Sequence, residues 1–431
     1  MKFSLAAAAA GSLSLVAAQR NTTANVQWDS WGVPHIFADT EEGLSFGFGY
    51  AHGRDHPTLL LRMIALGTAR SSEFQSGRIW ETFDAKAYKD RIPSSVEQLY
   101  PAMSPQSLAD FEAFAQGFNK YAAEHPVEFE DIAFKGLLPV SGRDIFSSNM
   151  RVLVSFAFAQ TFTLQAAVQE LFQNTPDPRQ AEVEADGKIH LSYMDWDPLK
   201  GMVPEEFREY IGSNAWAANG ASGRTTGNAM LNMNPHLAYL GFFRWYEAQL
   251  RCEPCGINVY GANLVGIPNL QIAFNDHLGW THTVNSVQPF SGFELHLHPD
   301  DPYRYMFDGA WRDMEIREDT FKALQEDGTY VIKTVVTEMT VHGTVTYRGE
   351  GRAIATRMAG IDTDEKRADA VGQWWAMGKA KNMEEFKDAM RTEQIPMFHT
   401  AVATKDGDIM ITNNAWVPDR GPDNCERNRD R

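Results

Sequence analysis

The sequence predicts an α+β fold, because helical and strand patterns fall in different parts of the chain. An apolar stretch of helical character lies before Ser213, near residues 152–171. Beyond Ser213 strand patterns follow one another at 331–339, 344–348, 353–358, 401–404 and 409–412. The last two flank Asp406-Gly407, a dipeptide that favours the tight turn of a β-hairpin.

A further β-hairpin is predicted around Ser213. Residues 215–219 form a short apolar run, residues 220–227 are of turn-forming types, and residues 231–234 alternate apolar with polar side chains. Ser213 is therefore expected to begin a buried strand. The hairpin returns the chain to His236, which is expected near the start of that strand.

The first residues have the pattern of a secretory signal peptide. Met1-Lys2 precedes an apolar run that ends in small residues, which predicts a leader at 1–18 with cleavage before Gln19. An N-glycosylation sequon follows at Asn21. No other stretch is long and apolar enough to span a membrane. We therefore expect a secreted protein with no membrane partner.

Composition bounds the size of the core and the type of partner. The 431 residues are 43% hydrophobic and 12% aromatic, which is enough for a sizeable core in two domains or in one composite fold. The formal net charge of -17 argues against a nucleic-acid partner. The acidic residues are scattered along the chain, so this charge does not indicate a substrate.

The cysteines and two histidines raise the question of a metal. Cys252 and Cys255 are three residues apart, which in an exported protein favours a local disulfide, with free thiols as the alternative; Cys425 is left unpaired. His52 and His56 have the spacing of zinc ligands on one helix face, but the glutamate of the zinc-protease motif is missing. We predict no metal and no cofactor.

The Gly212-Ser213 pair suggests a self-activating nucleophile. A glycine before the serine leaves the scissile carbonyl uncrowded, so this internal bond could cleave itself and expose Ser213 as an N-terminus. A serine hydroxyl needs a base, and a free α-amino group with a pKa of ~7.7–8.0 can act as one through a bridging water. No G-x-S-x-G motif of the usual serine hydrolases is present.

Three separated blocks carry a family resemblance. The first is GVPHI at 32–36 with FGFGYAHGRD at 46–55, the second is GSNAW at 212–216 with NPH at 234–236, and the third is GWTHTV at 279–284. Their order and spacing are far more specific than any single block. On these residues the chain resembles the penicillin acylase family of N-terminal nucleophile (Ntn) hydrolases, and most of all its acyl-homoserine-lactone acylase branch.

The resemblance implies an Ntn-hydrolase αββα sandwich, with two stacked antiparallel sheets between helix layers and a mostly helical α-chain part. It implies an α-chain region at 19–180, a spacer peptide at 181–212 that maturation removes, and a β-chain region at 213–431. The α and β fragments of the chain would stay together as a heterodimer. The β-chain region is expected to be truncated, without its C-terminal part.

The resemblance also implies roles for three residues. Ser213 is the nucleophile, the backbone N–H of Val284 is an oxyanion donor, and His236 lies where the family holds a residue that positions the serine and the amine. The family's second oxyanion donor, an asparagine followed by an orienting arginine, is expected past Arg431. Aromatic residues are candidates for an acyl pocket, with core packing as the alternative: Phe156, Phe158, Phe162 and the helix-compatible run at 242–246.

The function implied is hydrolysis of a non-peptide amide, which releases a carboxylic acid and an amine from a small-molecule N-acyl substrate. N-acyl homoserine lactones, acylated lipopeptides and β-lactam side chains are all candidates, which links the chain to signal or antibiotic turnover. The alternative from another class is a secreted, catalytically inactive binding or inhibitory paralogue, or a fragment of the same fold. A second enzymatic alternative is a conventional serine hydrolase with His236 or His282 as its base.

Overall fold

A computed structural model describes most of the chain between Thr23 and Pro418. The described residues are 23–158, 188–189, 212–222, 225, 227–285, 289–349, 351–359 and 368–418. The leader, the sequon asparagine, Phe162, Cys425 and almost all of the spacer lie outside them. Among the described residues no helix is long and apolar enough to cross a membrane.

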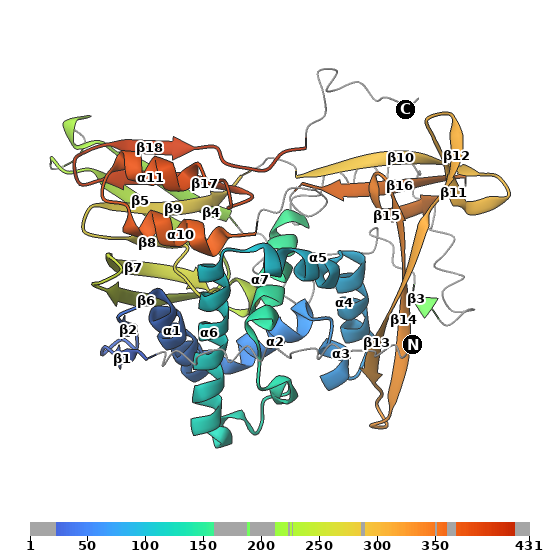
Figure 1. Ribbon diagram of the computed structural model, residues 1–431, viewed down its shortest axis with the longest axis horizontal. Coiled ribbons are helices and arrows are strands. Elements are labelled where there is room, and N and C mark those ends of the chain that lie inside the picture. Colours follow the sequence, from blue (N-terminus) through green and yellow to red (C-terminus); the bar gives the residue numbers. More distant parts are fainter. Residues whose placement is uncertain are drawn as a thin grey trace, which may run out of the picture.

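Helices dominate the first part of the described chain and occupy the lower centre of the molecule (Figure 1). They are α1 (Glu41–Asp55), α2 (Pro57–Gly67), α3 (Ser71–Phe74), α4 (Arg78–Lys89), α5 (Ile92–Leu99), α6 (Pro105–Glu124) and α7 (Gly142–Phe158). The two helices that pack closest start at capped positions: Thr40 Oγ1 accepts from Gly43 N in α1, and Ser104 Oγ accepts from Ser107 N in α6. The apolar helical stretch predicted near 152–171 is helical over 152–158, at the end of α7, and residues 159–171 lie outside the described residues.

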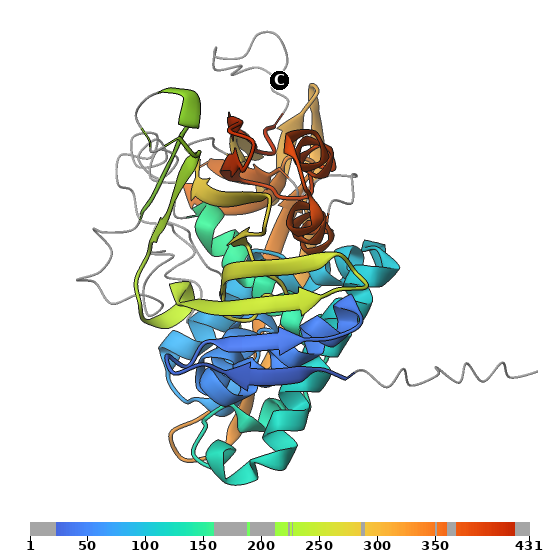
Figure 2. The same cartoon turned by 90° about the vertical axis from the view of Figure 1, so that its left-hand side faces the viewer.

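A mixed eight-stranded sheet joins the two ends of the described chain (Figures 1 and 2). Its strands, in spatial order, are β1 (Asn25–Trp28), β2 (Pro34–Phe37), β6 (Trp245–Cys252), β7 (Ile257–Leu264), β8 (Ile272–Phe274), β9 (Leu278–Val284), β17 (Phe398–Thr404) and β18 (Ile409–Thr412). The predicted β17–β18 hairpin is confirmed, with Gly407 at a positive φ of 98° in its turn.

One pairing in this sheet differs from the fully antiparallel arrangement that we expected. β2 runs parallel to β6, with His35 opposite Gln249 and Phe37 opposite Arg251. The two strands belong to the predicted α-chain and β-chain regions. Because no short connection joins them, nothing forces an antiparallel pairing. The α-chain region therefore contributes an edge hairpin to a sheet built mainly by the β-chain region.

A second sheet lies on the other side of the helices (Figure 1). Its strands, in spatial order, are β12 (Ala310–Asp313), β11 (Asp301–Phe307), β10 (Phe290–His298), β16 (Arg352–Met358), β15 (Gly343–Gly349), β14 (Tyr330–Thr340) and β13 (Glu315–Leu324). β3 (Lys188–Ile189), from the predicted spacer, pairs with β14. The strands predicted at 331–339, 344–348 and 353–358 are confirmed as β14, β15 and β16.

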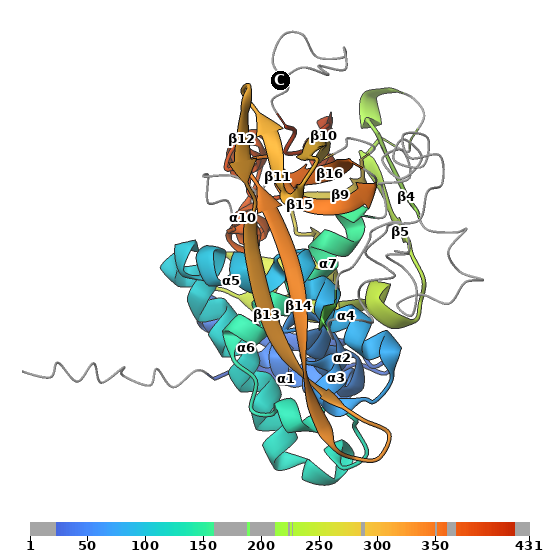
Figure 3. The same cartoon turned by 90° about the vertical axis from the view of Figure 1, so that its right-hand side faces the viewer.

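The β13–β14 hairpin is a long arm that crosses α3 and α4 (Figure 3). The ring of Phe321 stacks on that of Tyr88 at 6.3 Å, and Ser72 Oγ donates to Lys322 O at 3.1 Å. Phe321 is buried with Ala323 and Val335 in a small core beneath the arm. The arm is therefore a second place where the β-chain region holds the α-chain region.

Around β9 the structure has three stacked layers (Figure 2). Helices α10 (Ala370–Lys379) and α11 (Met383–Met390) cover one face, where the ring of Trp280 packs 6.3 Å from that of Phe386. The predicted hairpin β4 (Gly212–Ala218) and β5 (Met230–His236) covers the other, because a methyl group at Gly279 would lie 3.5 Å from Leu231 Cδ2. This order, helices then sheet then hairpin, is part of the expected αββα stack.

Two local expectations were wrong. Residues 242–246 do not form a helix: a 3-10 turn at Gly241–Phe243 is followed by β6, which starts at Trp245. Gly241 has a φ of 70° and begins the turn, and Trp245 and Tyr246 pair with β7 as strand formers do. Nor is β4 fully buried, since Asn214 is exposed and the Trp216 side chain is 63% exposed.

Candidate active site

Ser213 lies at the start of β4, directly beside the bond that is expected to break. Its Oγ donates to Gly212 O at 2.7 Å. In the register of the hairpin Gly212 is opposite His236 and Ser213 is opposite Pro235. The backbone of His236 therefore lies beside Gly212, but its side chain is on the exposed face of the hairpin, opposite to the face of Ser213.

The side chain of Ser213 points toward the sheet that contains β9. Along β4 the exposed residues are Asn214 and Trp216, and the alternate residues Ser213, Ala215 and Ala217 are half-buried. Successive side chains of a strand point to opposite faces, so Ser213 shares its face with Ala217. Ala217 is opposite Leu231, the residue that packs beside Gly279 of β9. The hydroxyl is therefore directed between the hairpin and the sheet that contains β9.

The backbone N–H of Val284 points away from β17. Asn285 N donates to Met397 O at 3.4 Å, and Val284 is opposite Phe398. Bonded and non-bonded pairs alternate along an antiparallel ladder, so the Val284 amide faces the other edge of β9. On that edge the register of β8 ends at Trp280. The amide is therefore directed away from β17, on the edge of β9 beyond its register with β8.

His282 is placed to support β9 and not to act as a base. It is 7% exposed, and its Nε2 accepts from Trp374 Nε1 at 3.0 Å. Its Nδ1 lies 3.1 Å from Thr400 Oγ1 and 3.3 Å from the backbone oxygen of His399. Both ring nitrogens are therefore engaged. Burial lowers the pKa of His282 to about 4, so the ring is neutral at pH 7.

His236, unlike His282, is not buried. It is exposed at the last position of β5, opposite Gly212. Its ring can therefore reach water and a ligand at the start of β4. The position of His236 in the chain, next to the start of β4, is the expected one, and its role in positioning the serine stays a prediction.

Aromatic pocket candidates from distant segments meet beside Val284. The ring of Phe156 lies 4.7 Å from that of Phe243 and 5.9 Å from that of Phe398. Phe398 is opposite Val284, and its ring lies 5.5 Å from that of His282. Phe156 and Phe243 are themselves buried core residues. The cluster is thus part of the core and also borders the candidate oxyanion strand.

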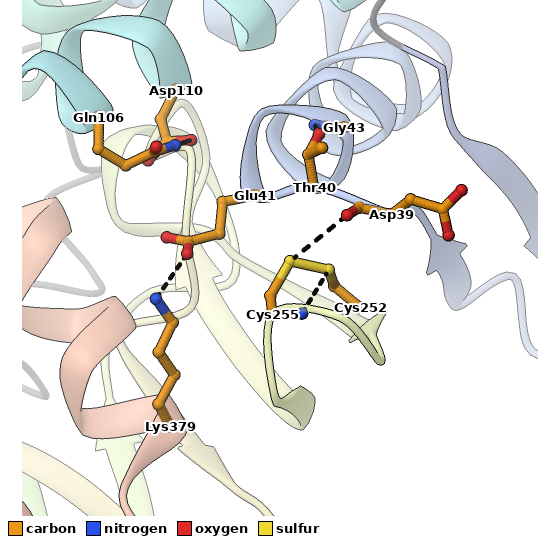
Figure 4. Close-up of a disulfide and its surroundings, with 9 residues drawn as sticks. All are labelled: Asp39, Thr40, Glu41, Gly43, Gln106, Asp110, Cys252, Cys255 and Lys379. Carbon is orange, nitrogen blue, oxygen red and sulfur yellow. Dashed lines mark hydrogen bonds and ion pairs between the residues drawn. A yellow bond between two sulfur atoms is a disulfide. The ribbon is translucent and has the colours of Figure 1, made fainter.

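The α-chain and β-chain regions are joined by polar contacts that the sequence did not indicate. Trp375 Nε1 of α10 donates to Asp110 Oδ2 of α6 at 3.0 Å, and Lys379 pairs with Glu41 at 2.5 Å (Figure 4). Burial, with the charge of Glu41, raises the pKa of Asp110 to about 8. These partners are more than two hundred residues apart, so no local pattern could have shown them.

The predicted disulfide is confirmed. Cys252 and Cys255 are bonded at the turn between β6 and β7, and Cys255 Sγ lies 3.9 Å from Asp39 O (Figure 4). Asp39 immediately precedes Thr40, the residue that caps α1. The disulfide therefore stabilises a turn of the β-chain region that touches the α-chain region.

His52 and His56 do not lie on one helix face. α1 ends at Asp55, and His56 has a non-helical φ of −139°. Their rings pack instead against the ring of Tyr246, at 4.8 and 4.7 Å. In the part of the chain that the structure describes, no group of three or more His, Cys, Asp or Glu side chains is arranged to hold a metal ion.

The buried His282 predicts acid sensitivity. Its pKa is about 4 in the folded protein and ~6.5 when unfolded, so its contribution to stability is complete above pH 6.5 and is lost as the pH falls toward 4. Asp110, with its raised pKa, acts in the opposite direction. We expect His282→Gln to reduce the slope of unfolding free energy against pH by about 1.4 kcal/mol per pH unit between 6 and 4.5. Urea unfolding across this range measures the slope; because Asp110 is common to both proteins, equal slopes would contradict the assignment.

Comparison with known protein families identifies the family of this chain. Residues 23–430 match the family model described as "Penicillin amidase". The chain belongs to the penicillin amidase family. The α+β fold and the family suggested by the sequence blocks are therefore confirmed.

Relatives within the penicillin amidase family are moderately similar. An acyl-homoserine lactone acylase PvdQ of Pseudomonas fluorescens (strain Pf0-1) is 29% identical over 425 residues, which are 94% of this chain and 52% of the relative. An aculeacin-A acylase of Actinoplanes utahensis is 25% identical over 410 residues, covering 90% of this chain and 49% of the relative. The chain thus spans about half the length of these curated relatives.

Among solved structures, a thermostable penicillin G acylase from Alcaligenes faecalis is similar. The identity is 23%, and the match covers 48% of this chain and 36% of the other, with a TM-score of 0.40.

Proposed function

We propose that this penicillin amidase family member is an amidohydrolase whose nucleophile, Ser213, becomes N-terminal when the chain cleaves itself at Gly212-Ser213. The observation that carries the proposal is the 2.7 Å hydrogen bond from Ser213 Oγ to Gly212 O. It holds the hydroxyl against the peptide group that it would attack. The family membership and the orientation of Ser213 toward β9 support the same role.

Self-cleavage would proceed through an ester. Ser213 Oγ attacks the carbonyl carbon of Gly212, the C–N bond breaks, and the nitrogen takes the proton that the hydroxyl gives up. Water then hydrolyses the ester, leaving a Gly212 carboxylate and a free Ser213 with its own α-amino group. A small residue before the serine suits this step, because no side chain crowds the carbonyl.

Substrate hydrolysis would use the same hydroxyl with the new amine as base. The amine of Ser213 takes the hydroxyl proton through a water as Oγ attacks the amide carbon. The Val284 N–H donates to the developing oxyanion, a contribution typically worth ~10²–10³ in rate. The leaving amine takes up the proton, and water releases the acyl group as a carboxylic acid. His236 would position the serine and its amine.

The processed fragments would remain associated as a heterodimer. Three kinds of contact cross between the predicted α-chain and β-chain regions: the parallel pairing of β2 with β6, the β13–β14 arm on α3 and α4, and the hydrogen bond of Trp375 to Asp110. The β2–β6 pairing and the β13–β14 arm lie on opposite sides of the molecule (Figure 1). Breaking one peptide bond at Gly212 leaves all of them in place.

The substrate would be a small N-acyl amide. The relatives' names concern acylases of acyl-homoserine lactones and of aculeacin A, both of which remove an acyl group. Beside Val284, the half-buried ring of Phe398 would contact that acyl group, backed by the buried ring of Phe156, which in turn packs on Phe243. The predicted leader at 1–18 further supports action outside the cell.

Mass spectrometry of the purified protein tests this function. We expect a fragment that begins at Ser213 and an N-terminal partner that co-elutes with it under native conditions. Ser213→Ala should leave the chain uncut, because no oxygen is present to attack, whereas Ser213→Thr or Ser213→Cys should retain some cleavage. Release of a fatty acid from an N-acyl homoserine lactone then tests hydrolysis.

Two results would contradict the proposal. A chain that is uncut and inactive would favour a binding or inhibitory protein on the same scaffold. An uncut chain that hydrolyses its substrate at full rate would favour a conventional serine hydrolase.

A further inference from the structure

His282 lies on β9 close to the candidate oxyanion donor, the backbone N–H of Val284. It lies two residues before Val284, so the two side chains share the strand face that packs against α10. Val284 is only half-buried at the end of the strand, whereas His282 is buried. Burial of a polar ring costs free energy unless its nitrogens are hydrogen-bonded, so the partners of His282 are the feature to explain.

The ring of His282 joins three elements. Its Nε2 accepts from the indole N–H of Trp374 in α10 at 3.0 Å. A neutral imidazole has one N–H, so the proton is on Nδ1, which donates to Thr400 Oγ1 and His399 O of β17. Each nitrogen thus has a defined role, and the tautomer is fixed by its neighbours.

These bonds compensate for missing backbone support. β8 pairs with β9 as far as Trp280, and beyond it β9 is paired in the described register with β17 alone. In the described register the last residues of β9, which include Val284, are therefore paired with a neighbouring strand on one edge. An oxyanion donor must be held within about 0.5 Å of its productive place to be useful. The bonds of His282 to β17 and α10 provide that restraint.

We propose that His282 is a positioning residue that fixes the Val284 amide by tying the end of β9 to β17 and to α10. The inference rests on the proposed function in one respect, namely that the Val284 N–H serves as the oxyanion donor. Trp374 and Thr400 contribute to the same restraint, since each forms a hydrogen bond with one nitrogen of the His282 ring.

Three substitutions at His282 separate the contribution of its hydrogen bonds to β17 from that of its hydrogen bond to α10. His282→Asn keeps a donor near the Nδ1 position, His282→Gln keeps an acceptor near the Nε2 position, and His282→Leu keeps neither. In the cleaved protein we expect His282→Leu to lower kcat roughly 10- to 100-fold with KM within a factor of two, because the donor and not the substrate is displaced. His282→Asn and His282→Gln should each recover part of the loss.

His52→Leu is the matched control. His52 is also buried, with its Nδ1 bonded to Phe48 O, but it belongs to α1, where its ring packs against Phe48, Phe114 and Tyr246 and not against β9 or α10. We expect a lower melting temperature and an unchanged kcat per cleaved molecule. Equal kcat for His282→Leu and the parent, or equal losses in both leucine variants, would overturn the proposal.

A second measurement remains informative even if the chain proves neither self-cleaving nor active. In the uncleavable Ser213→Ala protein, hydrogen exchange of the Asn285 amide, which donates to Met397 O, reports opening of the β9–β17 ladder. We expect His282→Leu to speed this exchange at least tenfold relative to exchange in β6. An unchanged exchange rate would show that His282 does not hold the end of β9 against β17. Should His282→Leu fail to fold, Trp374→Phe and Thr400→Val each remove one partner and are judged by the same two readouts.

Discussion

Replacing Val284 by proline is expected to lower the hydrolytic kcat by ~10²–10³-fold in the protein that has been cleaved, while the fold is retained. Proline removes the N–H that would donate to the oxyanion. In the interior of a sheet it would also remove a ladder hydrogen bond, but the Val284 amide points past the end of β8 and away from β17. Proline is tolerated at such strand edges. The experiment thus deletes one donor and leaves the pairing of β9 intact.

Val284→Ala is the matched control, because it keeps the N–H and removes the side chain. Val284 is half-buried at the end of β9, so the expected cost is about 1–2 kcal/mol of stability with kcat within a few-fold of the parent. Turnover is measured per mole of the fragment that begins at Ser213, which corrects for any change in self-cleavage. Similar kcat values for the two variants would show that the amide of Val284 is not an oxyanion donor.

The structural elements that the sequence predicted well are those whose signals are local. The β17–β18 hairpin follows from alternating residues around Asp406-Gly407, and the structure has the turn with Gly407 at a positive φ. The β4–β5 hairpin and the proximity of His236 to Gly212 follow in the same way from turn residues between two short runs. In each case the information lies within some twenty-five residues of chain.

The elements that the sequence did not show depend on partners far away along the chain. The parallel pairing of β2 with β6 joins His35 to Gln249, and neither segment contains a pattern that specifies the other. The burial of His282 was equally hidden, because its partners Trp374 and Thr400 come from another helix and another strand. From the sequence alone His282 was therefore open to interpretation as a base, although both of its ring nitrogens are engaged.

The run at 242–246 shows how short aromatic segments mislead. Phe242 and Phe243 are buried in a 3-10 turn, and Trp245 opens a strand. Five residues are fewer than two helical turns, so the periodicity of a helix cannot be distinguished from that of a strand. Tertiary packing against β7 decided between the two, and that information is absent from the run itself.

Gly117→Ala is expected to destabilise the folded protein by more than about 3 kcal/mol. The backbones of α1 and α6 approach most closely at Gly117 and Gly49: a Cβ at Gly117 would lie 1.9 Å from Phe46 O, and a Cβ at Gly49 would lie 1.9 Å from Phe114 O. Both obstacles are backbone oxygens of a packed helix, so neither can rotate away. Alanine favours a helix over glycine by only ~1 kcal/mol, which is too little to offset the separation of the helices.

The neighbouring substitution Gln116→Ala is the control. It tests whether the loss of stability comes from the contact of α6 with α1 or from any alanine placed in this turn of α6. Gln116 is exposed on the same turn of α6, so its replacement is expected to change the unfolding free energy by less than ~0.5 kcal/mol. Gly49→Ala should cost as much as Gly117→Ala, and the double variant should cost less than their sum, because helices already forced apart by one methyl group have room for the second. Urea unfolding of the uncleavable Ser213→Ala protein gives all four values free of processing. Full additivity, or a Gly117→Ala cost near that of Gln116→Ala, would show that α1 and α6 do not meet through these glycines.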